Sequence, residues 1–454
     1  MSSKPATVEP SVWALPHGPE PSNVIALWPG ETPPSLTEAL AGLQQRLGEG
    51  VELIDELDVA EDSPDAPSQV VWAAAIKLPG LVEPVVCWAQ AAAPAASGQL
   101  GDPRAEACRW AFGIEAVLGD DPVGEHFHVL RTLCHAFPDV PMVLDVNSTR
   151  CFTREELERM FTSDVEPSPH ELWAIHAVAD MDKGSPAWIH THGLWRCGLP
   201  ELEMLEVPQS HLRSAVDVLN TVASLLLESS PPAPGEPLEI GQDLAVALQP
   251  WQEVVRFVPP EAHGSMRDRS HDESEHSGVR AVVCAAKPQG TFRKVWVWPR
   301  EVVEHFNQDG AVRYLSARET ARQSAAARAA WPELATAFAA AQKRGLLNPQ
   351  RLRAVFLVKA GFSADGAADP DAEHREHLWF KIESFKGQAA RGELINQPFS
   401  IPSMQSGKRY DIPAAIVSDW HVQMQQGIFG SDRIAELWSA LDDASRQTTE
   451  GGAR

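Results

Sequence analysis

The sequence predicts an α+β fold: mixed or antiparallel sheets with helices packed on one face, followed by a small β-rich C-terminal module. Three observations lead to this prediction. Short apolar runs that are typical of strands recur along the chain. Helical spacing appears between them, as where Leu36, Leu40, Leu43 and Leu47 follow one another at three or four residues. Short Pro-Gly and polar breaks separate these segments and favour hairpins.

The first unit is expected over residues 21–165, after a mobile tail at 1–20 that is rich in Pro and Ser. The expected strands are 23–30, 51–57, 69–78, 81–92 and 141–148, and the expected helices are 35–47, 103–118, 124–137 and a short one from Thr153. Two helix starts carry the S/T-x-x-E spacing of a capping box, at Ser35/Glu38 and Thr153/Glu156.

A second unit with a similar plan is expected over residues 166–312, and the two units can also form one larger sheet. Its expected strands are 171–179, 187–195, 201–207, 279–287 and 292–299, with an amphipathic helix from Ser210. Residues 262–278 contain almost no apolar side chains, which predicts a solvated loop.

The last third begins with a helical connector over 313–350, in which Pro332 can occupy the first turn of a new helix. Short strands then favour a β-rich domain over 351–425. The polar end of the chain, residues 443–454, is expected to be a disordered tail.

The composition limits the classes of function. The net charge is −24, which disfavours binding to nucleic acids and to anionic membranes and favours a basic protein partner. No apolar run approaches the roughly 18 residues that span a bilayer, and Met1–Glu20 lacks a signal-peptide pattern. A cytoplasmic protein is therefore expected. The six cysteines form no CxxC pair, which favours free thiols.

The stretch AWIHTHGLWRCGLPELEML, residues 187–205, carries the strongest chemical signal. On a strand, His190 and His192 point to the same side, where two imidazoles can share one metal ion. In spacing, this stretch resembles the zinc isopeptidases of the JAMM type, which carry His-x-His, seven residues, Ser, two residues and Asp. Here Pro200 replaces the serine and Glu203 replaces the aspartate.

Two interpretations of this stretch remain open. As a zinc site it would use His190, His192 and Glu203 as ligands, with Glu201 as the general base of a hydrolase. As plain architecture it is a strand and its turn, in which Thr191, Gly193, Gly198 and Glu201 shape the backbone. The second interpretation is preferred, so no metal and no catalytic residue is assigned; zinc is the alternative cofactor.

Two further candidates receive no role. The HDESEH segment, residues 271–276, is rich in metal-binding side chains but has no packing to fix their geometry. Cys197 as a nucleophile would need a nearby base and a lowered thiol pKa.

The segment 376–420 is similar to the YegJ-like bacterial domain of unknown function. The matching residues are Glu376, His377, Trp379, Gly392, Leu394, Asn396, Pro398, Gly407, Tyr410, Ile412, Ile416, Asp419 and Trp420. The resemblance implies a small β-rich module and no particular activity. The front part resembles other uncharacterised bacterial α+β domains, some of them suspected antitoxin or immunity proteins.

The same segment supplies a candidate binding pocket. It comprises Glu376, His377, Trp379, Asn396, Asp419 and Trp420. The alternative is structural, with the Asp419 carboxylate capping backbone amides and the Trp420 indole in the core.

The leading functional hypothesis is an uncharacterised soluble bacterial protein without catalysis. It would act as a protein-interaction, immunity or accessory factor whose acidic face binds a basic partner. The alternative is a zinc-dependent peptidase or isopeptidase at residues 190–192.

Overall fold

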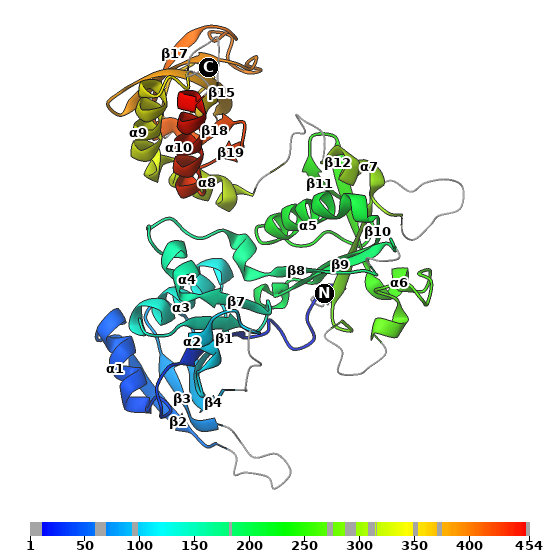
Figure 1. Cartoon of the computed structure of the whole chain (residues 1–454). Helices are drawn as coiled ribbons and strands as arrows, with labels where there is room; N and C mark the ends of the chain where they lie inside the picture. Colours follow the sequence, from blue (N-terminus) through cyan, green and yellow to red (C-terminus); the bar gives the residue numbers. More distant parts are fainter. Residues whose placement is uncertain are drawn as a thin grey trace, which may run out of the picture. The chain divides into compact units, whose positions relative to one another are not determined.

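The computed structural model contains two compact units, Met1–Ser316 and Ala317–Arg454 (Figure 1). It describes residues 11–59, 70–92, 99–180, 184–269, 276–286, 297–306, 314, 316–347, 353–369 and 375–450, with side chains up to residue 446. Both units combine antiparallel pairing with helices, and the second is rich in strands. The predicted α+β class with a β-rich C-terminal module is confirmed.

The first unit begins with a seven-stranded antiparallel sheet in the order β2-β3-β4-β5-β1-β6-β7. Its strands are β1 (Ser22–Trp28), β2 (Glu52–Leu57), β3 (Val70–Lys77), β4 (Val85–Ala91), β5 (Trp110–Ala116), β6 (Met142–Asp145) and β7 (Arg150–Thr153). Its helices are α1 (Leu36–Leu47), α2 (Pro103–Glu106), α3 (Pro122–Ala136) and α4 (Arg154–Met160). The two capping boxes that were predicted for this unit are present, at the starts of α1 and α4.

The helix predicted over 103–118 is wrong beyond its first turn. Residues 110–116 form β5, which lies inside the sheet between β4 and β1. A strand buried on both faces has a continuous apolar run, and periodicity cannot distinguish that run from a buried helix. Gly113 also indicates the strand, since a Cβ there would lie 2.1 Å from the Trp88 ring of the neighbouring strand.

A second, six-stranded sheet of the same unit has the order β11-β12-β13-β10-β9-β8. Its strands are β8 (Ala174–Val178), β9 (Ala187–His192), β10 (Glu201–Val207), β11 (Pro237–Gly241), β12 (Leu244–Pro250) and β13 (Arg280–Ala285). Its helices are α5 (Leu212–Leu226), α6 (Trp251–Val255) and α7 (Arg300–His305). Most of the strand predicted over 292–299 lies outside the described residues.

The two sheets share one hydrophobic core, which runs from Val24 and Phe112 of the first sheet to Ile189 and Val218 around the second. A smaller cluster lies on the other face of the second sheet, where Trp251 and Val254 of α6 pack on Trp188 and Leu205. β9 is consequently buried along its whole length.

The second unit is a six-stranded antiparallel sheet in the order β17-β16-β15-β14-β18-β19. Its strands are β14 (Ala354–Phe362), β15 (Glu376–Lys386), β16 (Ala389–Leu394), β17 (Arg409–Pro413), β18 (Val417–Met424) and β19 (Gly427–Phe429). Its helices are α8 (Ala317–Ala329), α9 (Trp331–Lys343) and α10 (Ile434–Glu450).

The helices are integral to this second unit. We expected 313–350 to connect two domains, but Trp331 and Phe338 lie in the same core as the strand residue Phe356. We expected a tail from 443, but α10 continues to residue 450, and Ala444 is buried. The apolar faces of these helices cover strands that would otherwise expose their core side.

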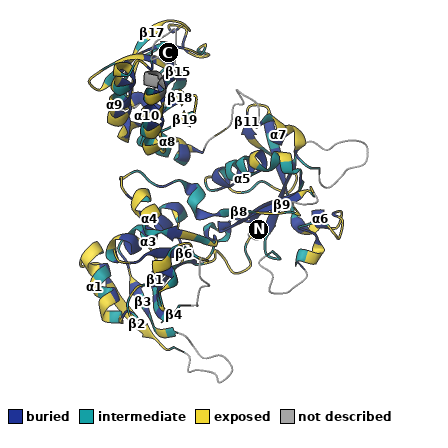
Figure 2. Cartoon of the chain, viewed as in Figure 1, coloured by how far each residue is buried: buried dark blue, intermediate teal, exposed yellow. Residues whose placement is uncertain are grey.

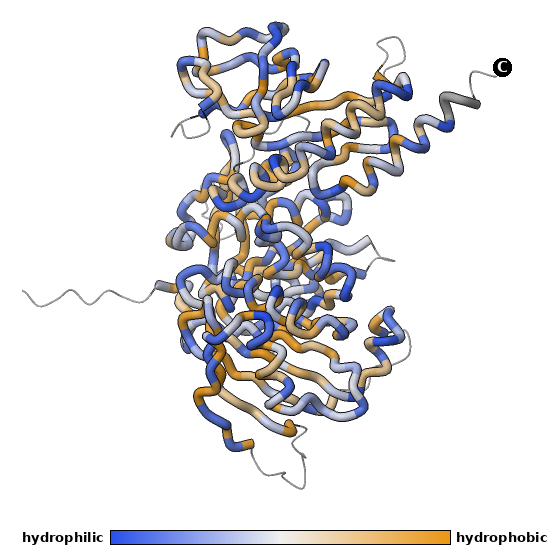
Figure 3. The backbone as a smooth tube through the Cα atoms, turned by 90° about the vertical axis from the view of Figure 1, so that its left-hand side faces the viewer, coloured by the Kyte–Doolittle hydropathy of each residue, from blue (hydrophilic) through white to orange (hydrophobic). Residues whose placement is uncertain are grey.

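Burial follows the same layering in both units. The strands are mostly buried, whereas helices such as α1 and α9 expose their outer faces (Figure 2). Helix α10, which leads to the C-terminus, has the same division into an apolar and a polar face. Hydrophobic and hydrophilic residues alternate along it (Figure 3). Within the described ranges, every helix is too short or too polar to span a bilayer.

We predict that residues 317–454 fold on their own and that Trp420→Ala destabilises them strongly. The Trp420 side chain is fully buried, and its Nε1 donates to the Ala327 carbonyl of α8 at 3.1 Å. Its truncation should cost roughly 3–5 kcal/mol in a urea titration. Trp379→Ala is the matched control, because Trp379 is only half-buried. Equal losses in the two variants would contradict this assignment of the core.

Candidate metal centre

Three histidines converge on one face of the second sheet. His176 of β8 and His190 of β9 are direct partners across the antiparallel pair, and His192 follows two positions later on β9. Directly opposed residues share a face, as do residues two apart on a strand. One ligand atom from each of the three side chains lies within 4.8 Å of the other two.

The three rings form a compact group, in which His190 and His192 are buried and His176 is half-buried. The ring centroids of His190 and His192 are 4.9 Å apart, and that of His176 lies 4.7 Å from His192 and 5.8 Å from His190. His190 is 1% exposed and His192 7%. The Nδ1 atom of His190 is buried and has no hydrogen-bond partner among the described residues. A buried ring nitrogen normally has a partner.

Two further rings complete the surroundings. The Trp188 indole stacks on His190 with centroids 4.0 Å apart, and this contact fixes the plane of the imidazole. The ring of His276 lies 4.9 Å from that of His190 and 5.5 Å from that of His192. His276 belongs to the HDESEH segment, which we did not assign to a site; the segment's other residues lie outside the described part of the chain.

The environment keeps two of these imidazoles neutral. Burial, followed by the Arg280 guanidinium and the neighbouring histidines, lowers the pKa of His192 to about 3. The same causes, burial first, lower the pKa of His190 far below its usual value. At neutral pH both rings are therefore in the neutral form, which is the form that coordinates a metal ion.

Glu203 lies next to the cluster but is held by other groups. It is the direct partner of His190 across β9 and β10. Its Oε2 accepts from Trp188 Nε1 at 2.9 Å and from Arg269 at 2.7 Å, in an ion pair whose side chains are both fully buried. Its Oε1 is buried without a hydrogen-bond partner among the described residues. The third convergent ligand atom comes from His176, and Glu203 is not part of that group.

Glu201 shapes the turn after β9. Its Oε1 accepts from the backbone amides of Gly193 at 2.7 Å and Leu194 at 2.8 Å, and its Oε2 accepts from the Thr191 hydroxyl. Gly193, at φ 117°, has no room for a side chain, because a Cβ would meet the Leu172 carbonyl at 2.4 Å. Both carboxylate oxygens of Glu201 are thus engaged in the turn.

The solvated loop predicted over 262–278 is wrong for the part that the structure describes. Met266–Arg269 form a short 3-10 helix, and Arg269 is buried between the Trp188 and Trp251 rings. The buried carboxylate of Glu203 explains this order, because it requires a cation. Sequence patterns of apolar residues carry no signal for such a contact.

Cys197 follows in the same turn but is not poised for attack. Burial raises the pKa of its thiol to about 12, so the thiol is protonated at neutral pH. The nucleophile is the thiolate.

In the second unit, the six candidate pocket residues are divided between structural contacts and one face of the sheet. Glu376 accepts from the amides of Phe399 and Ser400, and Asn396 accepts from the Trp379 amide. Trp420 is a core residue.

The other three pocket residues, His377, Trp379 and Asp419, are half-buried. His377 contacts the Ser418 hydroxyl at 2.7 Å, and the Trp379 ring lies 4.3 Å from that of His421. The side chains of Asp419 and His421 are 3.9 Å apart at their closest nitrogen and oxygen.

Two family models match parts of the chain. Residues 175–283, which include His176, His190, His192 and His276, are similar to the C-terminal part of a protein of unknown function (DUF4026). Residues 319–451 are similar to an uncharacterized protein conserved in bacteria (DUF2314). The resemblance of 376–420 to a bacterial domain of unknown function is confirmed at this level, and the YegJ-like name stays a prediction. No curated protein and no solved structure matches the chain.

The lowered histidine pKa values predict a pH dependence of stability in the metal-free protein. Unfolded histidine titrates near 6.5, so below that pH the unfolded chain binds more protons than the folded one. The free energy of unfolding is therefore highest above about pH 6.5. As the pH falls towards the folded pKa values, it decreases by up to about 1.4 kcal/mol per pH unit for each histidine. In urea titrations between pH 6.5 and 4, the free energy of unfolding should decrease less steeply for the double variant His190→Asn/His192→Asn than for the wild type. Parallel curves would contradict this.

Proposed function

We propose that the first unit binds a divalent transition metal, zinc foremost, through His176, His190 and His192. The observation that carries the proposal is the convergence of three ligand atoms within 4.8 Å. Zinc–nitrogen bonds of about 2.0–2.1 Å in tetrahedral geometry place ligand nitrogens about 3.3 Å apart. Adjustments of about 1 Å in the side chains are sufficient to reach that spacing.

The unsatisfied atoms support a cation at this position. His190 Nδ1 and Glu203 Oε1 are both buried polar atoms without a partner among the described residues, and they belong to cross-strand neighbours. Burying a polar atom without a partner is costly. A cation bound at His190 would satisfy its ring nitrogen and would also attract the neighbouring carboxylate.

The donor set favours a particular group of metals. Imidazole nitrogens suit zinc, copper, iron and nickel, whereas magnesium and calcium prefer oxygen ligands. A zinc ion held by the three histidines would keep a position for a water molecule, and it would make that water more acidic. His276 is the neighbouring side chain that can fill that position or hydrogen-bond to a group within it.

The zinc peptidase alternative receives less support than metal binding itself. Such an enzyme needs a general base and a group that stabilises the oxyanion. Glu201 is engaged in the turn through both oxygens, and Pro200 has no hydroxyl. The proposal is therefore a metal-binding protein, with no peptide hydrolysis assigned.

A second candidate function is the binding of a basic protein partner, and the distribution of charge favours it. Residues 317–454 contain 17 Lys and Arg and 16 Asp and Glu, so the whole acidic excess behind the net charge of −24 lies in residues 1–316. A one-sided charge steers and selects a partner of opposite sign. This role is compatible with the metal site, and a salt-dependent association with a basic protein is its expected signature.

We predict that the purified metal-free protein takes up one equivalent of zinc. His190→Ala/His192→Ala and His176→Ala should each abolish stoichiometric binding in equilibrium dialysis, because each variant leaves fewer than three ligands. His17→Ala is the matched control, since His17 is exposed and lies outside the cluster. Stoichiometric uptake of zinc by either of these variants, or none by the wild type, would contradict the proposal.

A further inference from the structure

Thr149 contacts the histidine cluster from the first sheet. It lies in the turn between β6 and β7, and its Oγ1 is 3.0 Å from His176 Nε2. We infer that Thr149 is a positioning residue that orients His176 for metal binding through Nδ1. The inference rests on the proposed metal-binding function, and three further observations carry it.

The first observation is the direction of the hydrogen bonds. The Thr149 hydroxyl lies 2.7 Å from the Ser148 carbonyl oxygen, which can only accept, so the single hydroxyl proton is donated there. Thr149 Oγ1 then acts as an acceptor towards His176, and the imidazole must carry its proton on Nε2. The lone pair is left on Nδ1. A hydrogen bond to the ring nitrogen that does not bind the metal fixes the tautomer and the ring plane of a metal-binding histidine.

The second observation is the backbone conformation. Thr149 has φ 56°, in the left-handed region that β-branched residues almost never adopt. Such a conformation persists only where the surroundings impose it, and such residues cluster at functional sites. Glycine or asparagine would fit this turn with less strain, but neither has the hydroxyl group that contacts His176.

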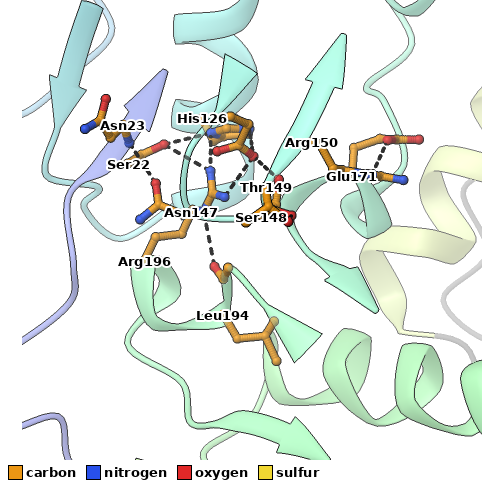
Figure 4. A network of polar contacts seen from close by, with 12 residues as sticks. Ser22, Asn23, His126, Asn147, Ser148, Thr149, Arg150, Glu171, Leu194 and Arg196 are labelled. Carbon is orange, nitrogen blue, oxygen red and sulfur yellow. Dashed lines mark hydrogen bonds and ion pairs between the residues drawn. The ribbon is translucent and has the colours of Figure 1, made fainter. Parts of the chain in front are cut away.

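The third observation is that the turn is fixed on several sides (Figure 4). Ser148 donates to Asp145, the side chain of Asn147 bonds to the backbone of Pro21 and Asn23, and the Thr149 amide donates to Val146. Asp145 in turn binds Arg196, which follows His192 by four residues. The turn is therefore a rigid support for Oγ1, and Asp145 at the end of β6 links it to the segment after β9.

The test compares three variants at position 149 with the wild type in zinc titrations of the full chain. Thr149→Val keeps the shape and the β-branch but removes the hydroxyl, and its zinc affinity should fall by about 10–100-fold. Thr149→Ser keeps the hydroxyl and should stay close to the wild type. Thr149→Gly removes the hydroxyl and relieves the strain, so it should fold well and still bind zinc weakly.

A purely structural role predicts a different pattern, in which zinc affinity follows melting temperature across the variants. Nitrogen NMR of zinc-loaded protein gives an independent readout, because His176 should be bound through Nδ1 with its proton on Nε2. Wild-type affinity in both Thr149→Val and Thr149→Gly, or binding through Nε2, would overturn the inference while leaving the metal site intact. Absence of zinc binding by the wild type would overturn both.

Discussion

The arrangement of the first unit depends on a fully buried ion pair between Asp145 and Arg196, 2.8 Å apart. Asp145 ends β6 in the first sheet, and Arg196 lies in the turn that follows β9 in the second. Removing one partner of such a pair is strongly destabilising, because the other charge remains buried and unpaired. The ion pair therefore fixes how the two sheets of this unit lie against each other. Ser22 and His126 extend it into a network that keeps the arginine in place (Figure 4).

The histidine cluster depends on a second buried ion pair. Arg269 neutralises Glu203 directly beside His190, and its guanidinium packs against the Trp188 ring that stacks on this histidine. The carboxylate is thus held by an arginine, while the imidazoles of His190 and His192 remain neutral and close together. Because Arg269 pairs with the carboxylate, the histidines need not be protonated to neutralise it. Their three ligand atoms therefore remain available for a metal ion.

Local signals in the sequence were sufficient for much of the fold. The Ser35 and Thr153 capping boxes and the strand that carries His190 and His192 depend on neighbouring residues alone, and they were predicted. The strand at 110–116 was not predicted, because a strand that is buried on both faces lacks the alternation of apolar and polar residues by which strands are recognised.

The candidate site could be predicted only in part for a related reason. His176 reaches the cluster through the pairing of β8 with β9, and the sequence had indicated both strands without their register. His276 reaches it from a segment with no apolar pattern. The contact of Thr149 with His176 joins different sheets, and no spacing along the chain encodes it.

X-ray absorption spectroscopy at the zinc edge of the zinc-loaded full chain tests the central claim most directly. The account predicts one zinc per chain with at least three imidazole nitrogens at about 2.0–2.1 Å and no sulfur ligand. A first shell dominated by sulfur near 2.3 Å, or by oxygen without imidazole scattering, would contradict the assignment of His176, His190 and His192 as a metal centre.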